Sequence, residues 1–245
     1  MTRLLVLQLD DQDPAARLGD WLTGAGAVLD VVKTYEQPLP GSLADHRGLV
    51  VLGGAMGALD DLDHPWLADV RKLLSHAVAK RVPTLAVCLG AQLLAAATGG
   101  QVRRGPHGPE VGVMLVAKRD VAGRDPLFAD LPWTPDVLQF HQDEIALLPP
   151  TAELLASSPK YPNQAFRVGD VVYGVQFHIE TTPEMVARWA QGAPELVATV
   201  PPARLDPERI ERGHEDIREV WQPFAERFVR LAAGEVSVPR NLPLV

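Results

Sequence analysis

Short apolar runs alternate with amphipathic stretches through the first part of this chain, and this alternation most restricts the folds that the chain can adopt. A strand that is apolar on both faces must be covered on both, and a helix between two such strands leaves them parallel. The pattern predicts strands at 4–9, 27–35, 48–52 and 84–87, and helices at 15–23, 66–80 and 91–98. We therefore expect an α/β fold with a doubly wound, mostly parallel sheet flanked by helices.

The middle and the end of the chain follow different patterns. Short strand candidates separated by Pro- and Gly-rich turns occur at 111–117, 137–140, 153–157, 164–168 and 171–177, which indicates a small added β-hairpin region. A helix should begin near Pro183, and apolar residues recur at helical spacing over 207–231. We read this last segment as an amphipathic helix that covers the core, in preference to a partner-binding helix. The predicted organisation is a main domain at 1–192 and a helical C-terminal extension at 193–245 packed on it.

Composition excludes several classes of protein. The formal net charge of −8 argues against binding of nucleic acid, which requires clustered Lys and Arg. Cys88 is the only cysteine, so an intramolecular disulfide and a cysteine-rich zinc site are excluded. No segment approaches the ~18 consecutive apolar residues of a membrane helix, and the apolar run at 4–9 is too short for a signal-peptide core. We expect a cytoplasmic protein that binds no membrane.

No metal or other cofactor is predicted. The seven histidines lack the spacing of zinc ligands. The acidic runs at 10–13 and 60–63 are interpreted as solvated loop or cap residues.

Cys88 is the candidate nucleophile. It stands between the apolar run at 84–87 and the helix predicted at 91–98, so it occupies a strand-to-helix turn. A nucleophile on such a bent turn needs small residues two positions away on either side, and Ala86 and Gly90 meet that requirement. A helix N-terminus also favours the thiolate, which is the reactive form. The alternative is that Cys88 is a small buried residue of the core.

A candidate base follows the apolar strand at 171–177. His178 and Glu180 are two residues apart, and alternate residues of an extended segment point to the same side. A cysteine nucleophile needs an imidazole, and the imidazole needs a carboxylate that fixes its tautomer. The motif is informative beside Cys88, because half-buried strands often end in polar residues for other reasons.

Two glycines, Gly53 and Gly54, end the strand at 48–52. Exposed backbone N–H groups there, together with the N–H of Leu89, can stabilise the oxyanion of a tetrahedral intermediate. An ordinary glycine turn is the alternative. The segment is too short for a dinucleotide fingerprint and lacks the lysine of a P-loop.

Three segments in this order, Gly53–Gly57, Cys88–Gln92 and Gln176–Glu180, resemble the motifs of class I glutamine amidotransferases. The segments Gln139–Asp143 and Asn163–Phe166 are similar to those of the stand-alone subgroup related to the glutaminase domain of GMP synthase. The resemblance implies a flavodoxin-like class I amidotransferase architecture.

The resemblance also implies a glutamine-hydrolysing enzyme with a Cys-His-Glu triad. Cys88 would attack the side-chain amide of glutamine and form a γ-glutamyl thioester. His178 would transfer the protons, and Glu180 would orient His178. The backbone amides of Gly54 and Leu89 would hold the oxyanion.

A set of substrate-binding residues is implied as well, namely Gly53, Gln92, Gln139, Phe140 and His141. Gln92 would help to bind glutamine, and the stretch at 139–141 would contact its amino-acid end. The alternative is that His141 and Asp143 form a structural hydrogen-bonded pair.

Two positions depart from the family pattern. Ile179 stands where proline is usual, so the direction of the backbone into the following helix should be less fixed. Ala55 replaces a frequent proline, which should loosen the oxyanion site. We expect an altered substrate preference rather than lost activity.

The fate of the ammonia divides the possible functions. The chain lacks the nucleotide loop of a synthetase domain, so a separate synthetase chain would receive the ammonia. The second hypothesis is a γ-glutamyl peptide hydrolase that uses the same triad. The third is a catalytically silent scaffold that uses the fold for binding.

Overall fold

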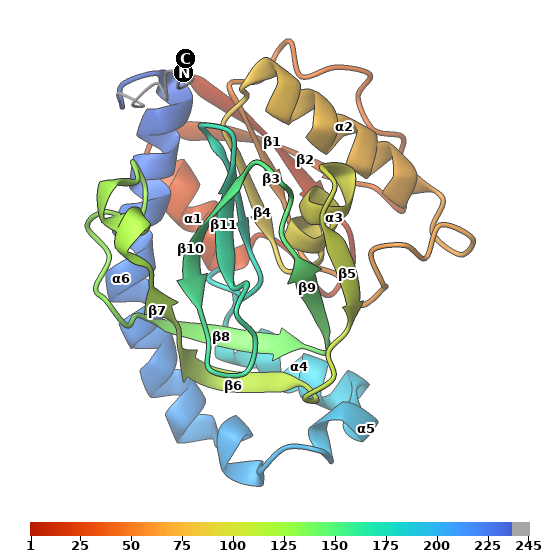
Figure 1. The fold of residues 1–245 in the computed structure, drawn as a ribbon, viewed down its shortest axis with the longest axis vertical. Helices are drawn as coiled ribbons and strands as arrows, with labels where there is room; N and C mark the ends of the chain where they lie inside the picture. Colours follow the sequence, from red (N-terminus) through yellow and green to blue (C-terminus); the bar gives the residue numbers. More distant parts are fainter. Residues whose placement is uncertain (237–245) are drawn as a thin grey trace.

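A central sheet of eight strands organises the computed structural model, which describes residues 1–236 (Figure 1). In spatial order the strands are β2 (Ala27–Lys33), β1 (Thr2–Gln8), β3 (Gly48–Val51), β4 (Thr84–Val87), β12 (Val172–Val175), β11 (Ala165–Val168), β10 (Ala152–Ser157) and β7 (Ala117–Lys118). The strands from β2 to β12 are parallel to one another, and those from β12 to β7 are antiparallel. The predicted α/β class is confirmed.

The parallel strands are buried as their sequences predict. Every residue of β3 and β4 is buried, and so are the last five residues of β1. β2 lies at the edge and leaves Val28 and Val31 exposed. A parallel sheet needs cover on both faces, and helices supply it.

Four helices cover the sheet. α1 (Ala16–Gly24) contacts α6 (Pro207–Ala233) on one side, and α2 (Trp66–Lys80) contacts α3 (Leu89–Ala97) on the other (Figure 1). α6 buries one apolar stripe, which includes Ile210, Ile217, Trp221, Phe224, Phe228 and Leu231. The indole of Trp221 also donates a hydrogen bond to the backbone oxygen of Asp136 (2.9 Å). The helical tail therefore packs on the core, as predicted.

Two small antiparallel sheets lie beside the main one. β5 (Gln101–Arg104) pairs with β9 (Asp143–Leu147), and β6 (Glu110–Leu115) pairs with β8 (Asp136–His141). The sequence did not predict β5 and β9, because polar residues interrupt the apolar alternation that marks a strand. β10, β11 and β12, which the sequence pattern assigns to the hairpin region, instead belong to the main sheet, and β12 pairs in parallel with β4.

The remaining elements are short. They are α4 (Pro183–Gly192), α5 (Pro194–Val197) and two 3-10 helices, Asp120–Arg124 and Pro202–Leu205. α4 begins where predicted, and Thr182 caps it by accepting a hydrogen bond from the N–H of Met185 (3.3 Å). The division of the chain at residue 192 stays a prediction, and the end of the proposed extension, 237–245, lies outside the described residues.

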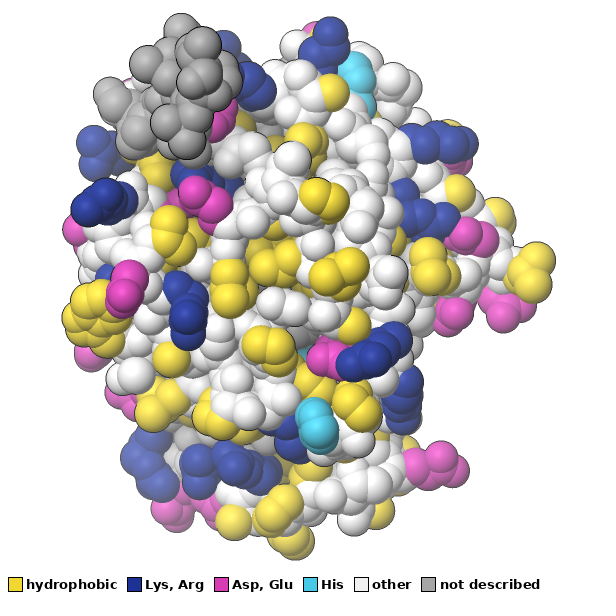
Figure 2. All heavy atoms as spheres, viewed as in Figure 1, with side chains coloured by type: hydrophobic (Ala, Val, Ile, Leu, Met, Phe, Trp, Pro, Cys, Tyr) yellow, Lys and Arg dark blue, Asp and Glu magenta, His cyan; other side chains and the backbone are white. Residues whose placement is uncertain are grey.

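Within residues 1–236, no helix has the length and apolar character needed to cross a membrane. On the face shown in Figure 2, Lys and Arg side chains lie among Asp and Glu, and the described residues form no continuous basic stripe there. The carboxyl ends of the parallel strands all meet at one edge of the sheet, where open α/β sheets bind their ligands.

Candidate active site

Cys88 lies on a sharp turn between β4 and α3. Its backbone has φ 50° and ψ −109°, a conformation that residues other than glycine rarely adopt. Two hydrogen bonds hold the turn: the N–H of Cys88 donates to the oxygen of Val175 (2.8 Å), and the oxygen of Cys88 accepts from the N–H of Gln92 (3.0 Å). The strained turn places the sulfur at the N-terminus of α3, as the sequence predicts.

The need for a small residue after the nucleophile is visible at Gly90. A Cβ atom there would lie 2.4 Å from the backbone oxygen of Val51. No side chain fits so close to the backbone of β3, so only glycine permits this path. On the other side of the turn, Ala86 is fully buried and pairs with both β3 and β12.

His178 and Glu180 form a buried hydrogen-bonded pair. Nδ1 of His178 lies 2.6 Å from Oε1 of Glu180, and both residues are at most 2% exposed. The backbone of His178 is fixed by two hydrogen bonds with Leu138 of β8 (2.8 and 3.2 Å). Nε2 of His178 has no hydrogen-bond partner within residues 1–236. Since Nδ1 is occupied by the carboxylate, Nε2 is the atom available for proton transfer.

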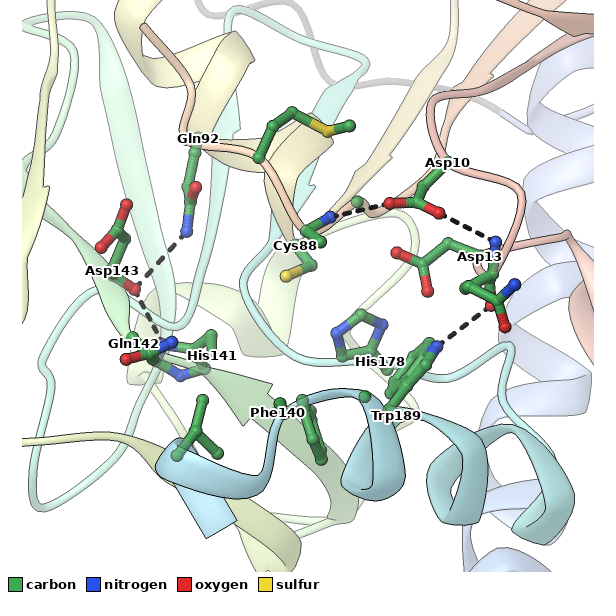
Figure 3. Close-up of a pocket in the computed structure, with 18 of the residues that line it drawn as sticks. Asp10, Asp13, Cys88, Gln92, Phe140, His141, Gln142, Asp143, His178 and Trp189 are labelled. Carbon is green, nitrogen blue, oxygen red and sulfur yellow. Dashed lines mark hydrogen bonds between the residues drawn. The ribbon is translucent and has the colours of Figure 1, made fainter. Parts of the chain in front are cut away.

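The charges around His178 favour its protonated form. Burial lowers the pKa of His178, but the Glu180 carboxylate and then the Cys88 sulfur raise it, and the net pKa lies well above its usual value. The Trp189 ring of α4 packs on the imidazole with 4.8 Å between the ring centroids. Cys88 and His178 line the same pocket (Figure 3). This arrangement can support a thiolate–imidazolium pair.

The candidate oxyanion donors lie next to each other. A Cβ atom at Gly54 would come within 3.0 Å of a methyl carbon of Leu89, so the two residues are in close contact. Neither backbone N–H has a protein acceptor in the part of the chain that the structure describes. Gly54 lines the pocket, and the role of both N–H groups as oxyanion donors stays a prediction.

The two departures from the family pattern each supply an N–H group that proline lacks. The N–H of Ile179 donates to Oε2 of Glu180 (2.9 Å), and the N–H of Ala55 donates to Oδ2 of Asp10 (3.2 Å). The sequence predicts a looser backbone at both positions. The structure shows both segments anchored to a carboxylate instead.

The proposed substrate-binding residues divide into two groups. Gln92, Phe140 and His141 line the pocket together with Cys88. Gln139 does not line it, since its side chain is fully buried and donates to Oε1 of Gln164 (2.8 Å). Gly53 lies behind the pocket surface, and its role stays a prediction, as do the roles of the other predicted site residues.

His141 belongs to a buried polar network. Its Nε2 lies 3.2 Å from Oε2 of Glu110, and its Nδ1 lies 2.8 Å from the backbone oxygen of Asp143. Glu110 also accepts hydrogen bonds from Ser158 and Gln164 (2.8 and 2.7 Å). The contact with Asp143 thus involves its backbone rather than its side chain. Both ring nitrogens of His141 are occupied by protein atoms.

Asp13 is one of the pocket residues that sequence reasoning missed. It is only 7% exposed and lines the pocket beside His178 (Figure 3). Our interpretation of the run at 10–13 as solvated residues is therefore wrong for Asp13. The polar composition of the run hid its position, but a signal was present, because the run directly follows the carboxyl end of a parallel strand.

The comparisons with known proteins agree with these motifs. The chain matches the family "Glutamine amidotransferase class-I" over residues 23–187, which is more than half of its 245 residues. It is 30% identical over 147 residues to Gamma-glutamyl peptidase 4 of Arabidopsis thaliana, covering 59% of this chain and 58% of that protein. It is 37% identical over 113 residues to one subunit of the GMP synthase (glutamine-hydrolyzing) of Pyrococcus furiosus, covering 46% of this chain and 58% of that protein. These matches span less than two thirds of each relative.

The fold likeness is more extensive. A crystal structure of a glutamine amidotransferase from Thermotoga maritima superposes with a TM-score of 0.82 and 27% sequence identity. The superposition covers 94% of this chain and 97% of that one. The likeness therefore includes the antiparallel strands and the C-terminal helix as well as the parallel sheet.

Proposed function

The chain belongs to the class I glutamine amidotransferase family, and on that premise we propose that it hydrolyses the side-chain amide of glutamine through a thioester on Cys88. Cys88, His178 and Glu180 are the proposed triad. The observation that carries the proposal is the meeting of a strained nucleophile turn and a buried His–Glu pair in one pocket.

In the first half of the reaction, the Cys88 thiolate attacks the γ-carbonyl carbon of glutamine. Negative charge develops on the carbonyl oxygen, and the N–H groups of Gly54 and Leu89 stabilise it. The C–N bond then breaks as the imidazolium of His178 gives its proton to the departing nitrogen. Ammonia leaves, and the γ-glutamyl group remains on the sulfur.

In the second half, a water molecule attacks the thioester. Nε2 of His178, now neutral, takes a proton from that water. The C–S bond breaks, glutamate is released, and the thiolate–imidazolium pair is restored. Glu180 keeps the same ring orientation throughout, because its hydrogen bond to Nδ1 (2.6 Å) does not depend on the substrate.

A glutamine-mimicking diazoketone tests the nucleophile. It should alkylate Cys88, giving one adduct that peptide mass spectrometry maps to this residue. Cys88→Ala should take no adduct and release no ammonia from glutamine while keeping the circular dichroism of the wild type. Full glutaminase activity in Cys88→Ala would refute the assignment.

A γ-glutamyl peptide is the second candidate substrate, and the size of the pocket supports it. The pocket volume of about 620 Å³ lies in the range of sites that hold ligands larger than one amino acid. The similarity to Gamma-glutamyl peptidase 4 points the same way. The thioester chemistry is identical, since only the departing amine differs.

Parallel assays separate the two substrates. We would measure ammonia released from glutamine and amino acid released from γ-glutamyl dipeptides, at equal concentrations of the same enzyme. A kcat/KM for dipeptides well above that for glutamine would replace the first proposal with the second.

A separate synthetase chain is the proposed recipient of ammonia if glutamine is the substrate. The similarity to a protein named as one subunit of a glutamine-hydrolysing GMP synthase supports this. Glutaminase activity that rises on adding a synthetase chain would identify such a partner. A scaffold without catalysis would show neither activity nor labelling of Cys88.

A further inference from the structure

Asp13 carries a buried carboxyl group that no other protein group binds. The residue lies on the loop between β1 and α1, is 7% exposed and lines the pocket. Within residues 1–236 its side chain accepts no hydrogen bond. Asp13 also precedes residues 23–187, the segment that matches the family. The carboxylate faces the pocket and has no donor from the protein, so a ligand in the pocket can supply one.

The carboxyl group lies beside the ring of His178. A Cβ atom at Gly53 would lie 3.2 Å from Oδ2 of Asp13 and also 3.2 Å from Cε1 of His178. Cε1 lies between the two ring nitrogens, so the carboxylate lies beside the edge of the imidazole that carries both Nδ1 and Nε2. Figure 3 shows Asp13 and His178 on one side of Cys88, with Gln92 and Asp143 on the opposite side.

The loop that carries Asp13 is fixed at several points. The N–H of Asp13 donates to the backbone oxygen of Asp10 (3.1 Å). The carboxylate of Asp10 in turn accepts from the N–H groups of Gln12 and Ala55 (2.9 and 3.2 Å). The indole of Trp189 donates to the oxygen of Gln12 (3.0 Å). The backbone that carries Asp13 is therefore held in place before any ligand binds, which favours a role in the reaction.

The charges that act on Asp13 are those of His178, Glu180 and Asp10. Burial raises the pKa of Asp13, the charge of His178 lowers it, the charges of Glu180 and Asp10 raise it, and the net pKa is about 7. The pKa of about 7 includes the charge of His178, so the ionised and protonated forms of Asp13 coexist near pH 7 and the carboxylate predominates at higher pH. The ionised form is the hydrogen-bond acceptor.

The nitrogen that leaves during the reaction must lie near Nε2 of His178. His178 can protonate it only within hydrogen-bond reach of Nε2, and Asp13 lies at the same edge of the ring. A primary or secondary amide nitrogen retains at least one N–H group as the C–N bond breaks. That N–H gains positive character when the nitrogen is protonated, so a carboxylate acceptor stabilises this stage more than the ground state.

We propose that Asp13 is the residue that receives the departing nitrogen: its carboxylate accepts an N–H hydrogen bond from the scissile amide while His178 protonates that nitrogen. The proton comes from His178 and stays on the amine, and Asp13 remains a carboxylate throughout. This inference rests on the proposed function, because it requires the thioester reaction at Cys88. It makes Asp13 a determinant of specificity for amide over ester substrates.

A pair of substrates with the same acyl group tests the proposal. Glutamine releases ammonia, whereas the γ-methyl ester of glutamate releases methanol and offers no N–H. We would compare kcat/KM, which reports formation of the thioester, for both substrates. Asp13→Asn should lower kcat/KM for glutamine by about tenfold to a hundredfold, because a neutral amide oxygen replaces the charged acceptor and the amide NH2 can take its place facing the substrate. The value for the ester should stay within about twofold of the wild type.

A matched control is available on the same loop. Asp11→Asn removes the same charge from a side chain that is 69% exposed and lies outside the pocket, so both kcat/KM values should stay as in the wild type. Asp13→Glu keeps the charge but displaces the oxygens, and it should lower the amide-to-ester ratio too. If Asp13→Asn does not fold, the amide-to-ester ratio of Asp13→Glu tests the proposal in its place.

Each outcome has a distinct meaning. An equal loss on both substrates in Asp13→Asn would overturn the proposal, since it would place the role of Asp13 in the triad rather than at the leaving group. Unchanged activity on both would overturn it as well. If the wild type cleaves neither substrate, the proposed function itself fails, and the role of Asp13 at the leaving group fails with it.

Discussion

The two walls of the pocket differ in how their polar groups are satisfied. We call Gln92 with the segment 140–143 the strand wall, and we call the residues that follow the parallel strands and line the pocket the loop wall, namely Asp10, Gln12, Asp13, the segment 54–57 and Cys88. On the strand wall, both nitrogens of His141 and the amide nitrogen of Gln92 are bound to protein atoms. On the loop wall, the carboxylate of Asp13 and the N–H of Gly54 are free among the described residues.

This contrast separates a surface that shapes the pocket from a surface that reacts. Groups whose partners are all within the protein gain little from a ligand, whereas free groups in a pocket gain most when a ligand supplies their partners. We therefore expect substitutions of residues that face the loop wall to change kcat/KM. Substitutions on the strand wall should change the free energy of unfolding.

The largest effect is expected at His178, which faces the loop wall. His178→Ala removes the proton donor and the counter-charge of the thiolate, so glutaminase kcat/KM should fall by about a thousandfold or more. The melting temperature and the circular dichroism serve as controls for folding. A variant that keeps a tenth of the wild-type activity would show that His178 is not the base.

On the strand wall, His141→Ala should act on stability instead. It leaves the buried Glu110 with the hydrogen bonds from Ser158 and Gln164 but without its contact with His141, and loss of one hydrogen bond to a buried charged group costs about 1.5–3 kcal/mol. Denaturant unfolding measures this change. Glutamine KM measured on the folded variant is the decisive comparison: a large rise in KM with unchanged stability would mean that His141 binds substrate.

Asp13 predicts a pH dependence of stability. In the folded protein its carboxyl keeps a proton up to a pKa of about 7, because burial disfavours its charge, whereas its ordinary pKa is 3.8. The folded state thus binds more protons between these values. The stability from this group is complete below pH 3.8 and is lost as the pH rises through about 7.

Asp13→Asn, which cannot ionise, should escape that loss. The free energy of unfolding of Asp13→Asn should exceed that of the wild type by an amount that grows from pH 4 to pH 8, up to about 4 kcal/mol. Thermal or denaturant unfolding across this range checks the slope, and Asp11→Asn should show no such growth. A constant difference at all pH values would contradict the raised pKa.

The smallest effect is expected at Ile179. Ile179→Pro removes the N–H that donates to Oε2 of Glu180, but the hydrogen bond from Nδ1 of His178 to Glu180 remains. One such hydrogen bond contributes about 0.5–1.5 kcal/mol, so kcat/KM should fall by about twofold to tenfold. Ile179→Val retains the N–H and is the control. Equal activity in both variants would show that this hydrogen bond does not support the triad.

The sequence predicted the parts of the molecule that follow local rules. The alternation of apolar runs indicated the parallel strands and their helices, and Gly90 beside Cys88 marked the strained turn, because only glycine allows the backbone to approach Val51 so closely. β5 and β9 escaped prediction, since a short polar strand has no periodic apolar signal of its own. Gln139 stands beside Phe140 in one motif, yet only the structure shows that its side chain leaves the pocket and binds Gln164.

By itself, the sequence determined the sheet pattern, the nucleophile turn and the His-x-Glu motif, because each depends on neighbouring residues within one short segment. The tertiary structure decided which polar groups are left without partners. Asp13, Gly53 and His178 are far apart in the chain, and their contact arises only when three loops converge at the carboxyl edge of the sheet. Whether a buried carboxylate has a donor depends on that convergence, which no local pattern of residues encodes.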